Sequence, residues 1–443
     1  MVRNFMLALV IGGCMSSVAA EKIMTPAARI EAVRGSPHYQ TALAIIRRDH
    51  ERIVSENIKL TEIPAPPFKE EAKAKVFSGM LRESGLANVE IDAEGNVIGL
   101  RKGSGNGPLI AVVSHLDTVF PAGTNVTVKR DGNKLRAPGI ADDTRGLAAI
   151  LALVRAMNEA RIETESDLLF VASVGEEGLG DLRGAKHLLL KGPYKDKITA
   201  FIALDGTDAA RVVTTAVGSR RYRLTFSGPG GHSFLAFGTV NPMYAMGAFL
   251  TQFGTIKVPP LTTYSPGVIG GGTSVNAIPA SAWLEIDMRS ANGPELDKME
   301  SQMREFASAA IASENQARST KNGEITVKID LIGDRPAGST VHPLLGTRQP
   351  AAARSPQGSA GNAQLAELAF EAVTAKGLTP ALDASSTDAN IAMSLGIPAI
   401  TLSAGVGGRI HSLEEWLDVD KDISLRQMEI VTTTVLAAAG MRL

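Results

Sequence analysis

Three apolar segments, each leading into charged residues, restrict the folds open to this chain. Residues 109–113, 168–173 and 200–204 are continuous runs of apolar and small side chains. Such runs are typical of strands that are buried on both faces of a parallel sheet. Each run follows a segment with helical periodicity, and this alternation predicts an α/β domain with helices on both faces of the sheet.

The first of these segments leads directly into His115 and Asp117. On an extended chain, residues two apart point to the same side, so this imidazole and this carboxylate are presented together. The carboxyl ends of strands are where an open α/β sheet builds its functional site. A His-x-Asp pair alone is more often structural than functional, so its interpretation depends on what the later strands carry.

Acidic residues follow the later strands, and a second histidine lies in the last loop: Asp142, Asp143, Glu176, Glu177, Asp205 and His411. Taken singly, each has an ordinary explanation, such as a helix cap, a solvated turn or a surface histidine. Taken together, they gather like charges at one sheet edge, which is unfavourable unless a cation holds them. Two histidines with several carboxylates suit zinc or a similar first-row divalent ion.

The pattern of the sequence changes after residue 212 and changes back after residue 335. In between, strands and helices come in the order βαββαβ, at residues 221–227, 241–253, 265–270, 281–289, 294–312 and 325–331. This order is that of the split, ferredoxin-like unit. The predicted segments are a signal peptide at 1–20, an α/β domain in two parts at 21–212 and 336–443, and an inserted domain at 213–335.

The N-terminus has the pattern of an export signal, with a basic start, an apolar centre at residues 5–11 and small residues up to Ala20. Cleavage after Ala20 predicts a secreted or periplasmic protein, whereas a lipoprotein signal would anchor the chain through Cys14. The apolar centre is too short to span a bilayer as a mature helix, so no transmembrane span is expected in the mature chain.

Composition excludes several classes of function. Cys14 is the only cysteine, which excludes an intrachain disulfide, a thiolate metal ligand and a cysteine nucleophile from the mature domain. The charges are balanced, with 45 Lys and Arg against 46 Asp and Glu, so no basic excess points to nucleic acid as a partner.

The chain resembles the zinc-dependent M20 family of metallopeptidases in segments along its length: SHLDTV, GIADDTRG, VGEEGLG, ALDG, GPGGHSF, NAIP, DMRS, STDAN and GRIHSLEEW. That family includes glutamate carboxypeptidases, tripeptide aminopeptidases and amino-acid deacylases. The resemblance implies a zinc-peptidase-like α/β/α catalytic domain with an inserted ferredoxin-like dimerisation domain, and hence a homodimer. It also implies two Zn²⁺ ions per subunit, with Co²⁺ or Mn²⁺ as substitutes.

The resemblance implies a set of metal ligands. Asp142 would bridge the two ions, with Asp143 as the alternative bridge. The carboxylate of Asp117 would orient the ring of His115. The full set of ligands would be His115, Asp142, Glu177, Asp205 and His411.

The resemblance also implies catalytic and substrate-binding residues. Glu176 would be the general base, and His232 would reach the active site of the partner subunit. Asn276 and Arg289 would bind the substrate. A structural loop role for His232 and an ion pair between Arg289 and Asp287 are the alternatives.

The predicted protein is an exported two-zinc metallopeptidase or amidohydrolase. It would cleave amide bonds of short peptides or N-acyl amino acids with a metal-activated water and Glu176 as base. The alternative is a tripeptide-type aminopeptidase that recognises the free N-terminus of its substrate. A non-catalytic metal- or peptide-binding protein on the same scaffold is a further alternative, but such a protein has no need of a free Glu176 beside a ligand.

Overall fold

The computed structural model describes residues 24–105, 107–339 and 359–443 of the 443-residue chain. The signal peptide expected at residues 1–20, with Cys14, lies outside the described residues. Within them, no helix is both long enough and apolar enough to cross a membrane.

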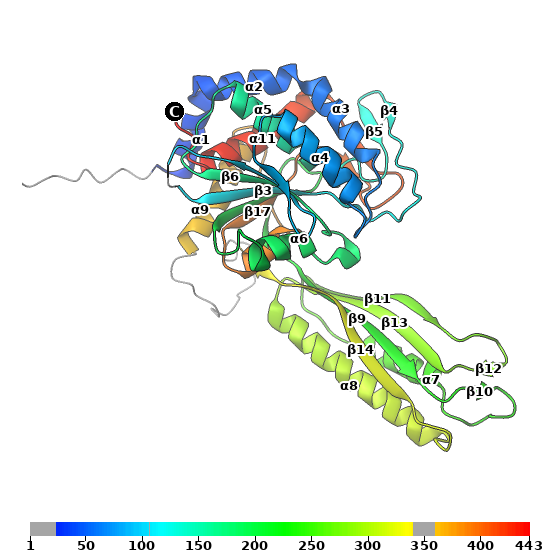
Figure 1. Ribbon diagram of the computed structural model, residues 1–443. Helices are drawn as coiled ribbons and strands as arrows, with labels where there is room; N and C mark the ends of the chain where they lie inside the picture. The colour runs from blue at the N-terminus through cyan, green and yellow to red at the C-terminus, as the bar shows by residue number, and fades with distance from the viewer. Residues whose placement is uncertain (1–23, 106, 340–358) are drawn as a thin grey trace, which may run out of the picture.

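A nine-stranded mixed sheet forms the centre of the larger domain (Figure 1). Its four central strands, β6, β3, β7 and β17, are parallel, as the sequence predicts. At one edge β1 and β2 form an antiparallel hairpin, because a tight turn can join only antiparallel strands. At the other edge β8 is antiparallel to β17 and β15 but parallel to β16. In spatial order the strands are β1 (Val89–Ile91), β2 (Val97–Arg101), β6 (Asp167–Ser173), β3 (Leu109–His115), β7 (Ile198–Leu204), β17 (Ala399–Leu402), β8 (Arg211–Ala216) and β15 (Gly338–Ser339), with β16 (Ala381–Ser385) also paired to β8.

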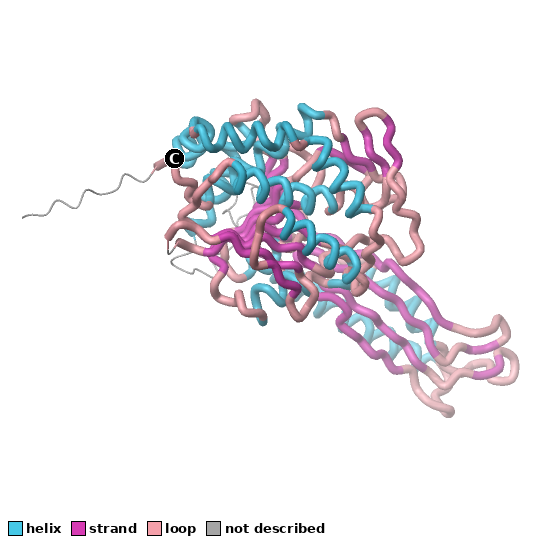
Figure 2. Tube along the Cα trace, turned by 45° about the horizontal axis from the view of Figure 1, so that its top comes forward, coloured by secondary structure: helices cyan, strands magenta, loops and turns pink. Residues whose placement is uncertain are grey.

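Helices cover both faces of this sheet, as Figure 2 shows around the central strands. Both faces need cover because successive side chains of β3 point to opposite faces and are buried on each. Ile110 and Val112 belong to one buried cluster, and Ala111 and Val113 belong to another. The first cluster packs against α1 (Pro26–Gly35), α2 (Pro37–Arg48), α3 (His50–Thr61), α4 (Glu71–Glu83), α5 (Thr144–Glu159), α9 (Ser359–Thr374) and α11 (Lys421–Ala438). The second packs against α6 (Arg183–Lys186), the following helical turn His187–Lys191 and α10 (Ala389–Ser394).

A small antiparallel sheet, which the sequence does not predict, joins two distant loops of this domain. Its order is β18 (Val406–Gly408), β19 (Trp416–Asp418), β5 (Lys134–Arg136) and β4 (Lys129–Asp131). The pairing of β19 with β5 aligns Trp416 with Arg136. The loop that contains His411 is thereby held next to the loop that contains Asp142.

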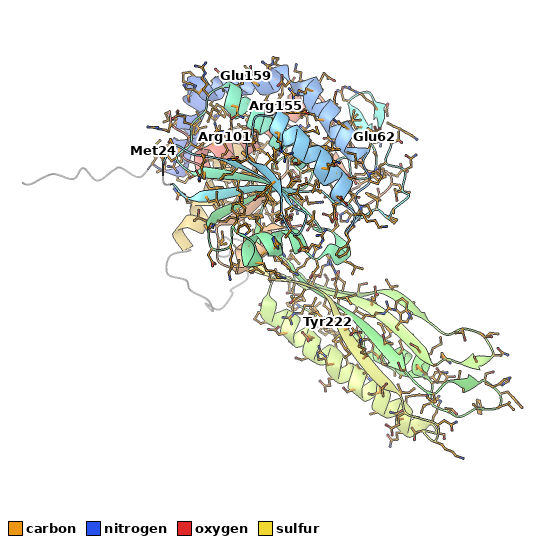
Figure 3. The ribbon with its side chains drawn as sticks, viewed as in Figure 1. Met24, Glu62, Arg101, Arg155, Glu159 and Tyr222 are labelled. Carbon is orange, nitrogen blue, oxygen red and sulfur yellow. The ribbon has the colours of Figure 1, made fainter. Side chains whose placement is uncertain are left out.

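The inserted domain has the predicted βαββαβ order, and Figure 1 shows it extending away from the larger domain. Its sheet order, β11-β13-β9-β14, is that of a ferredoxin-like fold. One face carries its own core, in which Tyr222 and Phe226 pack with Phe249 and Met303. Figure 3 labels Tyr222 at the end of this domain near the larger domain. The elements are β9 (Gly218–Ser227), α7 (Pro242–Phe253), β11 (Thr262–Gly271), β13 (Ser281–Ser290), α8 (Gly293–Ala317) and β14 (Thr326–Arg335).

The chain enters the inserted domain between β8 and β9 and leaves it between β14 and β15. Both β8 and β15 pair within the large sheet, so the two crossings lie side by side. At the opposite end of the inserted domain, β10 (Gly231–His232) and β12 (Ala277–Ile278) form a short two-stranded ribbon (Figure 1).

Candidate metal centre

His115 is the last residue of β3, and its ring is fixed on both sides. Its Nδ1 lies 2.9 Å from the backbone oxygen of Asp117, to which it donates, so Nε2 is the ring nitrogen that faces the site. That Nε2 lies 3.0 Å from Oδ1 of Asp142. The ring is buried, which leaves its orientation little freedom.

The carboxylate of Asp117 holds the backbone of the next strand end. It accepts the N–H groups of Glu176 at 2.9 Å and Glu177 at 2.8 Å. Its distance to Nδ1 of His115 is 3.7 Å, longer than a hydrogen bond. Asp117 therefore orients His115 through its backbone oxygen, while its side chain positions the two glutamates.

Asp142, rather than Asp143, faces both histidines. Its Oδ2 lies 3.1 Å from Nε2 of His411, and its Oδ1 faces His115. Asp143 points elsewhere, because its Oδ2 accepts the Ser114 hydroxyl at 2.6 Å and the N–H of His115 at 3.0 Å. Between the two candidates for the bridge, the geometry favours Asp142.

The predicted ligand atoms form two sets that share Asp142. His115, Asp142 and Asp205 offer one set of atoms within 4.8 Å of one another, and Asp142, Glu177 and His411 offer a second. In the second set, Oε1 of Glu177 lies 2.8 Å from Nε2 of His411. A carboxylate common to two such sets has the position of a bridging ligand. All the metal ligands expected from the sequence are thus brought together.

The electrostatics of the two sets require positive charge. Burial raises the pKa of Glu177 to about 7 and that of Asp205 well above its usual range. Hydrogen bonds that His411 donates to Asp142 and Glu177 raise its pKa to about 10. Burial opposes ionisation of Asp142, but its bonds to both histidines outweigh burial and lower its pKa. Imidazole and carboxylate donors in this arrangement, most of them buried, fit a divalent cation at each set.

Glu176 stands beside Glu177 but makes a different contact. Its Oε1 lies 3.1 Å from Nη1 of Arg335, and its backbone oxygen accepts a short hydrogen bond from Nη2 of the same residue. Both side chains are buried. Atoms of Glu176 also lie within 4.8 Å of His115 and Glu177, so the carboxylate is next to the proposed metal position.

Sequence reasoning gave no role to three further buried residues of the site. Glu415 accepts the N–H groups of Ala141 at 2.8 Å and Asp142 at 3.0 Å, and burial raises its pKa to about 7. Asp388 accepts a short hydrogen bond from the Ser173 hydroxyl. Both lie in motifs that carry the family resemblance, STDAN and GRIHSLEEW. The third, Arg335, has no local sequence signal, because it continues a strand.

Arg289 and His232 lie at opposite ends of the inserted domain. Nε of Arg289 lies 2.6 Å from Oδ2 of Asp287, the ion pair considered as its structural alternative, while the side chain stays partly exposed. Arg289 pairs in register with Ser219, as Arg335 does, so it belongs to the end near the metal centre.

His232 and Asn276 lie together at the far end of the inserted domain (Figure 1). Nδ1 of His232 accepts the N–H groups of Phe234 and Leu235, at 3.2 and 3.4 Å. The backbone oxygen of Asn276 accepts the N–H of Ser233 at 3.0 Å. Neither residue belongs to the metal-ligand sets of its own chain, as far as the described residues go.

Comparison with known proteins agrees with this architecture. The model of a family described as peptidase family M20/M25/M40 matches residues 111–437. The chain belongs to this family. It is therefore a hydrolase of the M20 peptidase family, and the matched region contains every residue of the two ligand sets.

Three individual proteins illustrate the likeness. Carboxypeptidase G2 from Pseudomonas sp. (strain RS-16) is 25% identical over 246 residues, which are 55% of this chain and 56% of that protein. Aminopeptidase PepT from Bacillus cereus has a similar fold, with a TM-score of 0.65 and 21% identity over 88% of this chain and 99% of that one. YXEP from Bacillus subtilis, described as a dinuclear metal-binding peptidase of the M20 family, has a TM-score of 0.60 and 17% identity over 87% of this chain and 98% of that one.

Proposed function

We propose that this M20 hydrolase uses two Zn²⁺ ions per subunit to cleave amide bonds of short peptides or N-acyl amino acids. The observation that carries the proposal is the shared carboxylate of Asp142, whose oxygens approach His115 at 3.0 Å and His411 at 3.1 Å. One ion would need only one of these two sets of donors, whereas two ions would use both sets and share Asp142. Co²⁺ and Mn²⁺ accept the same nitrogen and oxygen ligands and are expected to substitute.

The two ions, when bound, would supply Lewis acidity for activating a water and polarising the carbonyl of the substrate. Glu176 then acts as the base. Arg335 occupies its Oε1, so Oε2 takes the proton of the attacking water. As the C–N bond breaks, the same carboxyl delivers that proton to the leaving amine.

We assign His232 and Asn276 to the active site of a second copy of the chain. Both lie at the end of the inserted domain that is far from the metal centre of their own chain (Figure 1). A homodimer through the inserted domain would bring them to the partner's site. There the imidazole N–H of His232 would donate to the oxyanion that forms at the attacked carbonyl.

The proposed substrate has a free carboxylate that Arg289 recognises. The ion pair with Asp287 uses Nε, so the two Nη groups remain for a carboxylate. The likeness to carboxypeptidase G2 agrees with this assignment. The similar fold of the aminopeptidase PepT agrees with the alternative function, a tripeptide-type aminopeptidase. Such an enzyme would recognise the free amine of the substrate instead.

A hydrolysis screen tests the proposed function. The protein is stripped with a chelator, reloaded with zinc, cobalt or manganese, and offered dipeptides, tripeptides and N-acyl amino acids. We expect metal-dependent hydrolysis of substrates with a free carboxylate. Metal binding without turnover of any substrate would favour the non-catalytic binding protein.

We further propose that the protein is exported, on the sequence pattern of residues 1–20. N-terminal sequencing of the mature protein after cell fractionation tests this. A start at Glu21 indicates a soluble secreted or periplasmic protein, whereas a lipid-modified Cys14 indicates a membrane anchor.

A further inference from the structure

The inserted domain makes hydrogen bonds to the loop at residues 176–181, which carries the proposed general base Glu176. Three residues near the crossing between the domains contact this loop. Nη1 of Arg221 donates to the backbone oxygen of Gly178. The N–H of Asp334 donates to Oδ1 of Asp181 at 2.9 Å. The third contact is that of Arg335 with Glu176.

Arg335 is placed to control the position of Glu176. It is the last residue of β14, directly before the chain returns to the catalytic domain. Nη1 contacts Oε1 of Glu176 at 3.1 Å and the Ser386 hydroxyl at 3.0 Å, and Nη2 contacts the backbone oxygen of Glu176. Only 4% of the Arg335 side chain is exposed, so water does not compete for these contacts.

We propose that Arg335 is a positioning residue through which the inserted domain sets the orientation of the general base Glu176. The inference rests on the proposed role of Glu176. A planar guanidinium presents its N–H groups in a fixed fork, so it can hold the side chain and the backbone of one residue in a defined geometry, whereas an ammonium is a point charge on a flexible stem. Because Arg335 belongs to a strand of the inserted domain, a rotation of that domain at the crossing moves the base as well.

The alternative is that the buried pair only stabilises the fold. A buried ion pair does not by itself show a functional role. A stabilising pair predicts that its loss lowers stability and metal content together, with activity falling in proportion. A positioning contact predicts a loss of kcat with KM and metal content preserved, since a displaced base slows the chemical step.

The test compares Arg335→Ala and Arg335→Lys with Arg223→Ala. Arg223 is a matched control, because it lies on the same sheet but pairs with Glu285 at 3.0 Å and stacks over Trp283 within the inserted domain. For Arg335→Ala we expect kcat to fall by roughly 10²-fold at nearly unchanged KM and metal content. Added guanidinium ion should restore part of the activity of Arg335→Ala and none in Arg223→Ala. Arg335→Lys should recover less than half of the loss, because its flexible ammonium lacks the fixed fork that holds the side chain and backbone of Glu176 together.

Hydrogen exchange gives a second readout that is independent of activity. The amides of residues 174–182 should exchange faster in Arg335→Ala than in the parent, and remain unchanged in Arg223→Ala. A parental kcat in Arg335→Ala, or a loss of kcat that follows the loss of metal, would overturn the proposal. If the alanine variant does not fold, Arg335→Lys carries the same test. Absence of hydrolysis by the parent would instead reject the proposed function, and the exchange measurement would still report whether Arg335 anchors the loop.

Discussion

Nε2 of His411 lies 3.1 Å from Oδ2 of Asp142, although the two residues come from loops far apart in the sequence. The small sheet that pairs β19 with β5 brings these loops together. Asp142 is held from the other side by Glu415, which accepts its N–H at 3.0 Å. The second ligand set therefore depends on a contact between two loops. In the first set, His115 and Asp205 instead stand where strands β3 and β7 of the large sheet end.

Loss of His411 should therefore remove one ion and keep the other. His411→Ala leaves Glu177 and Asp142 without their imidazole, while His115 and Asp205 are untouched. Elemental analysis of the zinc-loaded parent should give about two equivalents per chain, and the variant about one. One equivalent or less in the saturated parent would exclude the two-ion centre.

Glu176 and its neighbour Glu177 should respond differently to the same substitution. As a base, Glu176→Gln is expected to lower turnover by at least roughly 10²-fold with the metal content of the parent. Glu177→Gln is the matched control and should lose metal, because Glu177 belongs to the second ligand set. If Glu176→Gln loses metal instead, the roles of the pair are reversed.

The assignment of His232 to a second subunit can be tested by mixing two inactive proteins. In a heterodimer of His232→Ala with Glu176→Gln, one site has an intact Glu176 and receives an intact His232 from its partner. Partial activity should return after subunit exchange. As a control, Glu176→Gln is mixed with a double variant that carries both His232→Ala and Glu176→Gln. No site in that mixture has a base, so it should stay inactive. Exchange without recovery would show that His232 acts within its own chain or only in its loop.

The position of His50 predicts a pH dependence of stability. Its side chain is 4% exposed, and burial lowers its pKa below the ordinary value of 6.5, despite the nearby Glu51. Below pH 6.5 the unfolded chain therefore binds a proton at this residue that the folded chain rejects, so stability falls as the pH falls. His50→Gln should lessen this loss by up to about 1.4 kcal/mol per pH unit as the pH falls below 6.5. Urea unfolding of both proteins at matched metal content measures the difference, and parallel curves would contradict the prediction.

Much of the site could be predicted because it lies where parallel strands end. His115 ends β3, and the acidic ligands and base candidate follow the neighbouring strands β6 and β7: Glu176, Glu177 and Asp205. The apolar runs identify these strands. The order of elements in the inserted domain was also predictable, since β13 and most of β9 alternate between buried and less buried residues.

Other parts of the site depend on contacts that leave no local pattern. The small sheet consists of strands of three residues, too short for a periodic signal. Arg335 occupies a strand position like any other, and only the crossing between the domains brings it to Glu176. The placement of His232 far from its own metal centre likewise follows from the length of the inserted domain, which the sequence does not give.

The last prediction concerns Arg289 and the class of substrate. Its neighbours in the strand, Met288 and Ser290, are buried, while Arg289 points to the open face that Asp287 shares. A guanidinium there can bind a carboxylate through two parallel hydrogen bonds, which an amide cannot match. The parent should therefore prefer peptides with a free C-terminal carboxylate over the corresponding amides.

Arg289→Ala should erase that preference. Loss of one partner of a charged bidentate contact is expected to cost about 2–4 kcal/mol, or roughly 30- to 1000-fold in kcat/KM for the acid substrate. The amide should be hydrolysed by the variant and the parent at similar rates, because it makes no such contact. Arg223→Ala, on the same face but paired with Glu285, is the control and should keep the preference. Equal rates of the parent on acid and amide would mean that Arg289 serves only its ion pair with Asp287. Recognition would then fall to the free amine of the substrate, and the aminopeptidase alternative would replace the carboxylate-binding one.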